Sequence, residues 1–316
     1  MMKFPGLLFT LLILTPTFHV FAQEKNRKLP QIPVEQMVEA LKPQTYCAFV
    51  AERDDDFAFE NNYIAMRFYG PALRDKPEGA GCDCWTKRVE YPIVDKWYRL
   101  SFAGHSYHID RGEGWDAYKV GNSAGTGGTA LWIDGDRAEL DCFTEYEILE
   151  NSPERCSFIL TYEAEIGGSV YKEEKKISLE LDQRLYSAVS TFWKDGRIAS
   201  GLPVCVGLAT HDGAAIATAD VRSGWISCWE TMEDGSGLGT AATMPPGQIK
   251  SIEFQKGKSE TGQGNSGHIL MVAETDDEGK IRYAAGYGWE LAGTILSQDD
   301  WTEYLTGYCK KSYASK

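Results

Sequence analysis

Long runs in which apolar and polar side chains alternate constrain the fold of this chain more than any other feature. The longest of three such runs is KKISLELDQRLYSAVSTFW at residues 175–193; the others are RCSFILTYEAEI at 155–166 and IAMRFYG at 64–70. Because successive side chains of a β-strand point to opposite faces of its sheet, this period predicts strands with one buried face. The runs are also rich in β-branched and aromatic residues, which fit a pleated, half-buried surface.

Aspartate–glycine pairs predict tight turns between these strands. The pairs are Asp134-Gly135, Asp195-Gly196, Asp212-Gly213 and Asp234-Gly235. Such pairs readily adopt the positive φ angles of a two-residue hairpin. The 32 glycines do not cluster into a linker, and we find no internal repeat. We therefore expect residues 23–316 to form a single all-β domain, a large antiparallel β-sandwich of two packed sheets.

Short helices are predicted at both ends of this domain. VEQMVEALKP at 34–43 has an amphipathic pattern that Pro43 stops. In SQDDWTEYLTGY at 297–308, Ser297 and Asp300 form a capping-box pattern, and four aromatic or aliphatic residues then recur with the helical period. We expect this second helix to dock on the sandwich.

The N-terminal segment at 1–22, MMKFPGLLFTLLILTPTFHVFA, has the layout of a secretory signal: an early lysine, an apolar run and a small residue, Ala22. No later segment reaches the roughly 18 apolar residues of a membrane span. We therefore expect an exported protein, periplasmic or extracellular, that is not inserted in a membrane.

The charge of the chain excludes one class of partner. Residues 23–316 carry 31 basic and 46 acidic side chains, a net charge of −15. Nucleic acid is not an expected partner, because binding a phosphate backbone requires a basic surface. An anionic ligand would need positive charge concentrated at its site against the overall field.

Metal binding has little support in the sequence. The eight cysteines favour buried thiols or one to three disulfides over zinc, since only Cys82 and Cys84 are close and no second close pair has metal-ligand spacing. Asp54, Asp55 and Asp56 could coordinate a structural calcium, but the solvated start of a strand is the favoured interpretation. We expect no cofactor.

Tryptophans beside lysine and arginine suggest what the protein binds. They occur in CDCWTKRVEYPIVDKWY at 82–98 and in GWISCWE at 224–230. Aromatic faces can stack on sugar rings, and planar cations hold carboxylates or sulfates. The combination favours an acidic oligosaccharide, although any one of these tryptophans could equally belong to the core.

The densest group of proton-exchanging side chains lies in GHSYHIDRGEGWDAYKVG, at 104–121. Two of the four histidines that follow Ala22 are here, His105 and His108. If this stretch is a strand, the two histidines lie on opposite faces, so they should not act as a pair. A bend at RGEG could change where each of them points.

Four blocks resemble the hallmark blocks of the domain of unknown function 4861 family. They are DDFAFENNYIAMRFYGPAL, DCWTKRVEYPIVDKWY, YHIDRGEGWDAYKVGNSAGTGGTALW and GWISCWE, within residues 50–307. Members of that family are exported bacterial proteins, often associated with polysaccharide breakdown, and an ulvan oligosaccharide dehydratase is similar to it. The resemblance implies a sandwich like that of galactose mutarotase and action on oligosaccharides that contain uronic acid. Arg111 stands where a second histidine is expected, which puts identical chemistry in question.

The resemblance and the residue types together suggest a β-elimination at a uronate. His108 is suited to one proton transfer because its pKa is ordinarily near neutrality, and Tyr107 or Tyr118 could carry the other. The residues expected to bind the substrate are Glu60, Arg67, Trp85, Lys87, Arg88, Trp97, Arg111, Glu113, Asp116, Lys119 and Trp229. A glycoside hydrolase would instead use two carboxylates among Glu60, Glu113 and Asp116. A non-catalytic carbohydrate-binding protein would need the aromatics but not His108.

Overall fold

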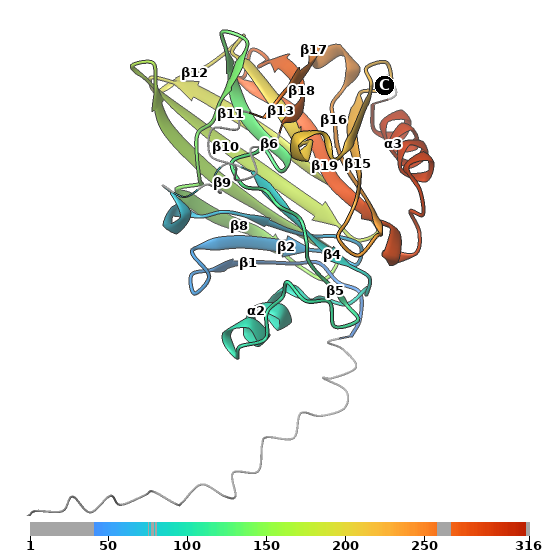
Figure 1. The fold of residues 1–316 in the computed structure, drawn as a ribbon. Helices are drawn as coiled ribbons and strands as arrows, with labels where there is room; N and C mark the ends of the chain where they lie inside the picture. The colour runs from blue at the N-terminus through green and yellow to red at the C-terminus, as the bar shows by residue number, and fades with distance from the viewer. Residues whose placement is uncertain (1–40, 75, 77–78, 80, 258–266, 314–316) are drawn as a thin grey trace, which may run out of the picture.

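A computed structural model describes residues 41–74, 76, 79, 81–257 and 267–313. Their strands form three sheets in which all pairings between neighbouring strands are antiparallel (Figure 1). The N-terminal sheet has the order β1 (Tyr46–Val50), β2 (Asp56–Glu60), β3 (Ala65–Phe68), β4 (Cys82–Lys87) and β5 (Gly114–Asp116). The third sheet has the order β17 (Ile249–Gln255), β18 (His268–Glu274), β13 (Pro203–Ala209), β6 (Thr126–Ile133) and β7 (Asp136–Ala138).

The large sheet has nine strands and contains the two longest alternating runs of the sequence, at 155–166 and 175–193. Its order is β14 (Ile216–Asp220), β15 (Trp225–Thr231), β16 (Gly237–Thr243), β19 (Lys280–Trp289), β11 (Leu185–Lys194), β10 (Ser169–Glu180), β9 (Arg155–Ile166) and β8 (Glu145–Asn151), with β12 (Arg197–Ile198) paired to β11. Strands β9 and β10 each have 12 residues and pair along their full length.

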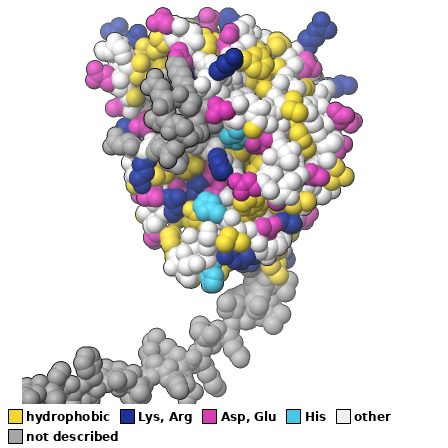
Figure 2. Space-filling view, in the orientation of Figure 1, with side chains coloured by type: hydrophobic (Ala, Val, Ile, Leu, Met, Phe, Trp, Pro, Cys, Tyr) yellow, Lys and Arg dark blue, Asp and Glu magenta, His cyan; other side chains and the backbone are white. Residues whose placement is uncertain are grey.

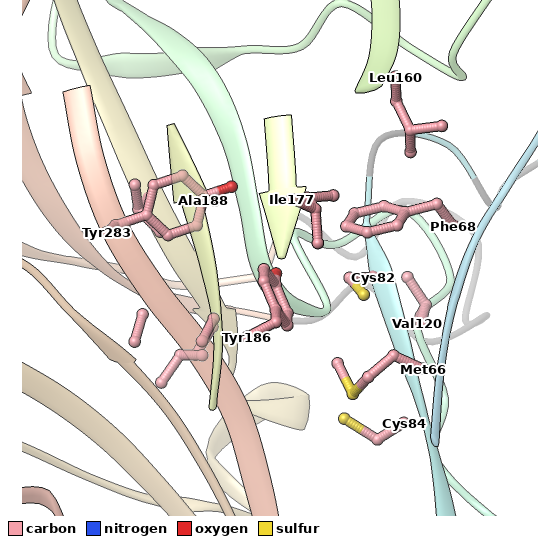
Figure 3. Packing of buried hydrophobic residues seen from close by; sticks show 14 of the residues in the cluster. Met66, Phe68, Cys82, Cys84, Val120, Leu160, Ile177, Tyr186, Ala188 and Tyr283 are labelled. Atoms are coloured by element: carbon pink, nitrogen blue, oxygen red, sulfur yellow. The ribbon is translucent and has the colours of Figure 1, made fainter. Parts of the chain in front are cut away.

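The main core lies between the large sheet and a layer made by the other two sheets. Within that layer, a bridge between Cys82 at the start of β4 and Gly125, directly before β6, joins the N-terminal sheet to the third sheet. Figure 3 shows Met66 and Phe68 of β3 opposite Ile177 and Tyr186 of the large sheet. Two packed layers with one shared apolar interior confirm the predicted β-sandwich.

All eight cysteines are buried as thiols, and no disulfide joins any two of them. Several lie in the main core, including Cys82 and Cys84 of β4 (Figure 3). Of the two alternatives that the sequence left open, the structure therefore has buried thiols. They pack there as small apolar side chains.

Alternation along the N-terminal sheet separates two kinds of surface. Phe57 and Phe59 of β2 point into the main core, whereas Asp56 and Glu60 of the same strand point to the outer face. The same period in β3 turns Arg67 outward. This outer face would be open to water without a cover, and it carries several ionisable groups.

Helix α2 (Val94–Phe102) provides that cover and was not expected from the sequence, which predicted helices only at the ends. Its Val94, Trp97 and Tyr98 are buried against the outer face of the N-terminal sheet. The carboxylate of Glu60 accepts hydrogen bonds from the backbone N–H groups of Ile93 and Val94, at 2.9 and 2.8 Å. This satisfies donors that a helix start leaves unpaired, so a residue of β2 caps α2.

At the other end, α3 (Gln298–Tyr313) confirms the predicted docking helix. The N–H of Asp300 donates to the hydroxyl of Ser297 at 3.2 Å, as the capping pattern predicts. The carboxylate of Asp300 reaches the N–H of Leu296 rather than that of Ser297, at 3.0 Å. The helix buries Trp301 and Leu305 against the outer face of the large sheet. Of the predicted N-terminal helix, residues 34–40 lie outside the described part, and residues 41–43 are not helical.

The docking of α3 depends on a glycine in β16. A Cβ added to Gly239 would lie 2.5 Å from the ring of Trp301, so Gly239→Ala must displace the indole. We expect it to lower the free energy of unfolding by about 1–3 kcal/mol, measured by urea denaturation. Gly247→Ala is the control, because a Cβ at Gly247 meets nothing within 4 Å. Equal effects of the two substitutions would contradict this account.

Among the described residues, no helix is long and apolar enough to cross a membrane.

Candidate functional site

The outer face of the N-terminal sheet carries a buried cluster of one guanidinium and three carboxylates. Arg67 lies 3.4 Å from Asp56, 2.5 Å from Asp83 and 3.2 Å from Asp116. All four side chains are nearly inaccessible to water. A single positive charge faces three acidic groups, so the cluster would be strongly negative if all three were ionised.

Proton binding relieves this excess of negative charge. Burial raises the pKa of Asp56 to about 6, although the charges of Arg67 and Arg53 oppose the shift. Burial, reinforced by the charge of Asp83, holds the pKa of Asp116 well above its usual range. Asp116 can therefore keep a proton at a pH where an exposed aspartate has lost it, as a general acid must.

His108 lies directly beside Asp116. Its Nδ1 is 3.0 Å from the backbone carbonyl oxygen of Asp116 and 3.6 Å from the Oδ2 atom of its carboxyl group. A carbonyl oxygen can only accept, so Nδ1 carries the proton and Nε2 of the neutral ring has the lone pair. The His108 side chain is 61% exposed. The ring is thus held at one nitrogen and open to a ligand at the other.

These groups line a cavity of about 960 Å³. Its walls include Arg53, Arg67, His108, Asp116, His211 and Glu230. Figure 2 shows histidines and side chains of both charges gathered near the middle of one face of the molecule. The volume is at the upper end of the range typical of small-molecule sites and is sufficient for more than one sugar ring.

Five of the residues singled out in the sequence meet in this first cavity: Arg67, His108, Asp116, Tyr118 and Lys119. Tyr118 is buried, and burial holds its pKa well above the usual range. Its phenol therefore remains protonated and can donate a hydrogen bond, but it is poorly suited to act as a base. Lys119 lies at the mouth, 80% exposed and paired with Glu233 at 3.1 Å.

Four others line a second, smaller cavity of about 350 Å³ between α2 and the loop before β5: Trp97, Tyr107, Arg111 and Glu113. His105 is here too, so the two histidines line different cavities, although residues 104–113 form turns and bends and not the strand that the alternation argument assumed. Glu113 accepts hydrogen bonds from Lys96 at 2.5 Å and from the indole of Trp97 at 3.1 Å. Arg111 donates to the backbone oxygen of Ile109 at 3.2 Å, which holds the loop together.

Tyr107 separates the two cavities. Its hydroxyl accepts a hydrogen bond from Nε of Arg53 at 2.9 Å and a longer one from Arg67 at 3.5 Å. Its ring packs on Trp85, with centroids 4.9 Å apart. Tyr107 therefore connects the aromatic layer under α2 to the cationic wall of the first cavity.

Glu60 and Lys87 form a buried ion pair at 2.8 Å, apart from both cavities. Lys87 also donates to the backbone oxygens of Asn61 and Tyr91, at 2.8 and 3.0 Å. Together with the cap on α2, these contacts give the pair a structural role. Trp85 is buried, and the Cζ atom of Arg67 lies 5.2 Å from the centre of its indole ring. The indole also stacks on that of Trp97.

Arg88 and Trp229 lie outside both cavities. Arg88 pairs with Asp110 and lies over the ring of Trp289, at 4.8 Å. Trp229 of β15 packs against the cluster around α3. The next residue, Glu230, points to the other face of the strand and lines the first cavity.

Three important lining residues were not singled out from the sequence. Arg53 directly precedes the three aspartates and Glu230 directly follows Trp229, and in both places only the neighbouring residues were considered from the sequence. His211 precedes an aspartate–glycine pair that predicted only a turn. Its Nδ1 lies 2.8 Å from Glu230, and its Nε2 lies 2.8 Å from the backbone oxygen of Lys119.

The acidic triplet does not converge on one point. Asp54 pairs with Arg53 and with Lys76, whereas Asp56 points to Arg67 and accepts a hydrogen bond from Tyr98 at 2.9 Å. Within the described ranges, no group of three histidine, cysteine or acidic side chains is arranged to hold a metal ion.

Comparison with known proteins identifies relatives of the whole chain. The sequence model of a family described as a domain of unknown function, DUF4861, matches residues 16–314. Uncharacterized protein P7 of Formosa agariphila is 33% identical over 276 residues, which cover 84% of this chain and 67% of that protein.

Two solved structures show a distant likeness to the chain. Heparinase III matches 74% of this chain with 5% identity and a TM-score of 0.37, and a putative kojibiose phosphorylase from the human microbiome matches 87% with 7% identity and 0.42. The chain spans 35% and 37% of the lengths of those proteins. At these identities and TM-scores, the likenesses assign no activity to this chain.

Proposed function

The chain belongs to the DUF4861 family, and we propose that it is a carbohydrate-active enzyme that acts on oligosaccharides containing uronic acid, by β-elimination at the uronate. The observation that carries the proposal is the pairing of His108 with Asp116 at the wall of the first cavity. The contact of Nδ1 with the backbone oxygen of Asp116 leaves Nε2 of His108 available to accept a proton, and burial holds the pKa of Asp116 well above its usual range. A base and an acid placed together are what an elimination requires. We further propose, from the signal-like segment that ends at Ala22, that the protein acts outside the cytoplasm.

In this mechanism, Nε2 of His108 removes the proton at C5 of the uronate. The electron pair of the C5–H bond forms the C4–C5 double bond, and the C4–O bond breaks. The departing oxygen takes a proton from Asp116, directly or through water. If that oxygen is a hydroxyl, water leaves; if it is a glycosidic oxygen, the chain is cleaved. His108 and Asp116 then exchange protons with solvent to restore the starting state.

The cations of the first cavity suit the carboxylate of such a substrate. Removing the C5 proton places negative charge on that carboxylate, which a nearby guanidinium stabilises. Arg53 and Arg67 line the cavity on the side of His108. Lys119 is the further candidate at the mouth, whereas Lys87 and Arg88 are held elsewhere by their own partners.

Ultraviolet absorbance tests this function directly. The purified protein is incubated with a panel of saturated uronate oligosaccharides, and we expect absorbance from the new conjugated double bond to rise with at least one of them. Newly formed reducing ends, assayed in parallel, distinguish chain cleavage from dehydration of a chain end. Binding without turnover across the panel would overturn the enzymatic proposal.

Hydrolysis is the second candidate because Asp116 and Glu230 both line the first cavity. A raised pKa on one of two carboxyl groups is the arrangement that glycosidases use. Hydrolysis would create reducing ends without any rise in absorbance. The same experiment therefore separates the two reactions.

A further inference from the structure

The wall of the first cavity opposite the N-terminal sheet has an unusual backbone. His211 and Asp212 have φ angles of +46° and +55°, and Gly213 follows at +86°. Residues with side chains are disfavoured in this left-handed region. Such conformations persist only where the surroundings hold them, and they concentrate at functional sites.

The surroundings hold the His211 ring at both nitrogens. Nε2 faces the backbone oxygen of Lys119 at 2.8 Å, and Nδ1 faces Oε2 of Glu230 at 2.8 Å. The ring of Tyr118 packs edge-on against it, with centroids 4.9 Å apart. A carbonyl oxygen accepts only, and so does an ionised carboxylate, so a ring that satisfies both carries two protons.

The charges around His211 agree with this geometry. Burial opposes a charge on the ring, but the hydrogen bond and charge of Glu230 outweigh it and raise the pKa of His211. Lys119, whose ammonium is paired with Glu233, acts weakly against protonation. His268 adds little repulsion because burial lowers its own pKa to about 3, which leaves it neutral.

Glu230 completes the pair, and its two carboxylate oxygens have different surroundings. Its Oε2 is taken by His211, whereas Oε1 receives no hydrogen bond from the described residues. The side chain is largely buried, at 13% exposure, yet it lines the first cavity. A fixed carboxylate with one open oxygen is suited to accept hydrogen bonds from sugar hydroxyls.

We propose that His211 and Glu230 form a second functional pair in the first cavity, in which His211 stays protonated as a positioning residue and Glu230 contacts the substrate through a sugar hydroxyl. The substrate contact rests on the proposed function, whereas the protonation of His211 does not. The pair would bind and orient the sugar, while His108 and Asp116 transfer protons on the opposite wall.

Ring nitrogen NMR tests the protonation without any substrate. Few histidines are present, and His211→Gln identifies the signal of His211. We expect both nitrogens of its ring to be protonated at pH 7, and the midpoint of its titration to fall by about one pH unit or more in Glu230→Gln. Glu274→Gln, which removes an exposed carboxylate paired with Lys250, should leave the midpoint unchanged. A neutral ring at pH 7, or a midpoint that Glu230→Gln does not move, would overturn the proposal.

Kinetics test the substrate contact on whichever acidic oligosaccharide the wild type turns over. Glu230→Gln should raise KM by about tenfold or more, with a smaller effect on kcat, because a bond to a charged acceptor is lost. In the wild type, KM should rise as the pH passes the midpoint of His211 measured by NMR, and this limb should vanish in His211→Gln. An unchanged KM in Glu230→Gln would refute the contact. If the wild type turns over no oligosaccharide, the proposed function and the substrate contact fail, while the NMR result still decides the protonation of His211.

Discussion

We expect His108→Gln to lower kcat on an acidic oligosaccharide by about 10²–10⁴-fold, which is the usual contribution of a general base. Glutamine can keep the hydrogen bond to the backbone oxygen of Asp116, but its amide has no basic nitrogen to present to the substrate. The side chain is mostly exposed, so the fold should be unaffected, as thermal unfolding can verify. The measurement is the initial rate of absorbance change at saturating substrate.

His105→Gln is the matched control for this result. His105 belongs to the same loop but lines the second cavity. We expect its rate to remain close to that of the wild type. If His108→Gln retained full activity, or if both variants lost it equally, the assignment of His108 as the base would be refuted.

Arg67→Met should be the most destabilising of the substitutions discussed, lowering the free energy of unfolding by about 3–5 kcal/mol. Methionine fills part of the same space but leaves Asp56, Asp83 and Asp116 buried without their cation. Arg282→Met, which removes an exposed pair with Asp276, should cost only about 0–1 kcal/mol. Similar losses in the two variants would contradict a buried cluster organised by Arg67.

The pH dependence of Arg67→Met has a definite sign. The pKa of Asp56 is already raised from 3.8 to about 6, so the folded state binds more protons than the unfolded state between these values. Stability linked to this group therefore falls as pH rises through that window. Arg67 lowers the pKa values of Asp56 and Asp116, so both rise further without the guanidinium, and Arg67→Met should be more stable at pH 5 than at pH 8. Urea denaturation at the two pH values measures the difference, and greater stability at pH 8 would contradict the interpretation.

The sequence predicted the parts of the fold that depend on local pattern. Alternation identified the strands around 155–166 and 175–193, and the Ser297 cap identified α3. Helix α2 was missed because its cap, Glu60, lies 34 positions before Val94 in the chain. The sequence of the helix segment alone does not indicate this hydrogen bond, because the residue that accepts it lies outside the segment.

The candidate site was also predicted only in part, because the sequence pattern indicates residues that are close in the chain but not contacts between distant segments. His108 and Asp116 are eight positions apart, and the sequence singled out both, but it expected His108 and a tyrosine to carry the protons and Asp116 to bind the substrate. Glu230 and His211 come from distant segments, and neither was selected from the sequence. Their neighbours were selected instead: Trp229 as a substrate-binding residue, and Gly213 as part of a turn. Asp212-Gly213 does make a turn, but the turn places His211 in the first cavity and does not close a hairpin. Glu60 and Lys87 were selected for their charge, and only the packing of the outer face shows that they neutralise one another.

The first cavity takes one wall from each of the three sheets. Arg67 comes from β3, His211 follows β13, and Glu230 lies in β15. Arg67 is separated from the other two by well over a hundred positions of chain, and joining such distant segments is slow in folding because of the entropy lost when long loops close. The cavity can therefore form only after all three sheets have assembled. Catalytic activity would then be among the last properties to return on refolding, and its recovery would report the completed sandwich more faithfully than recovery of β-sheet signal.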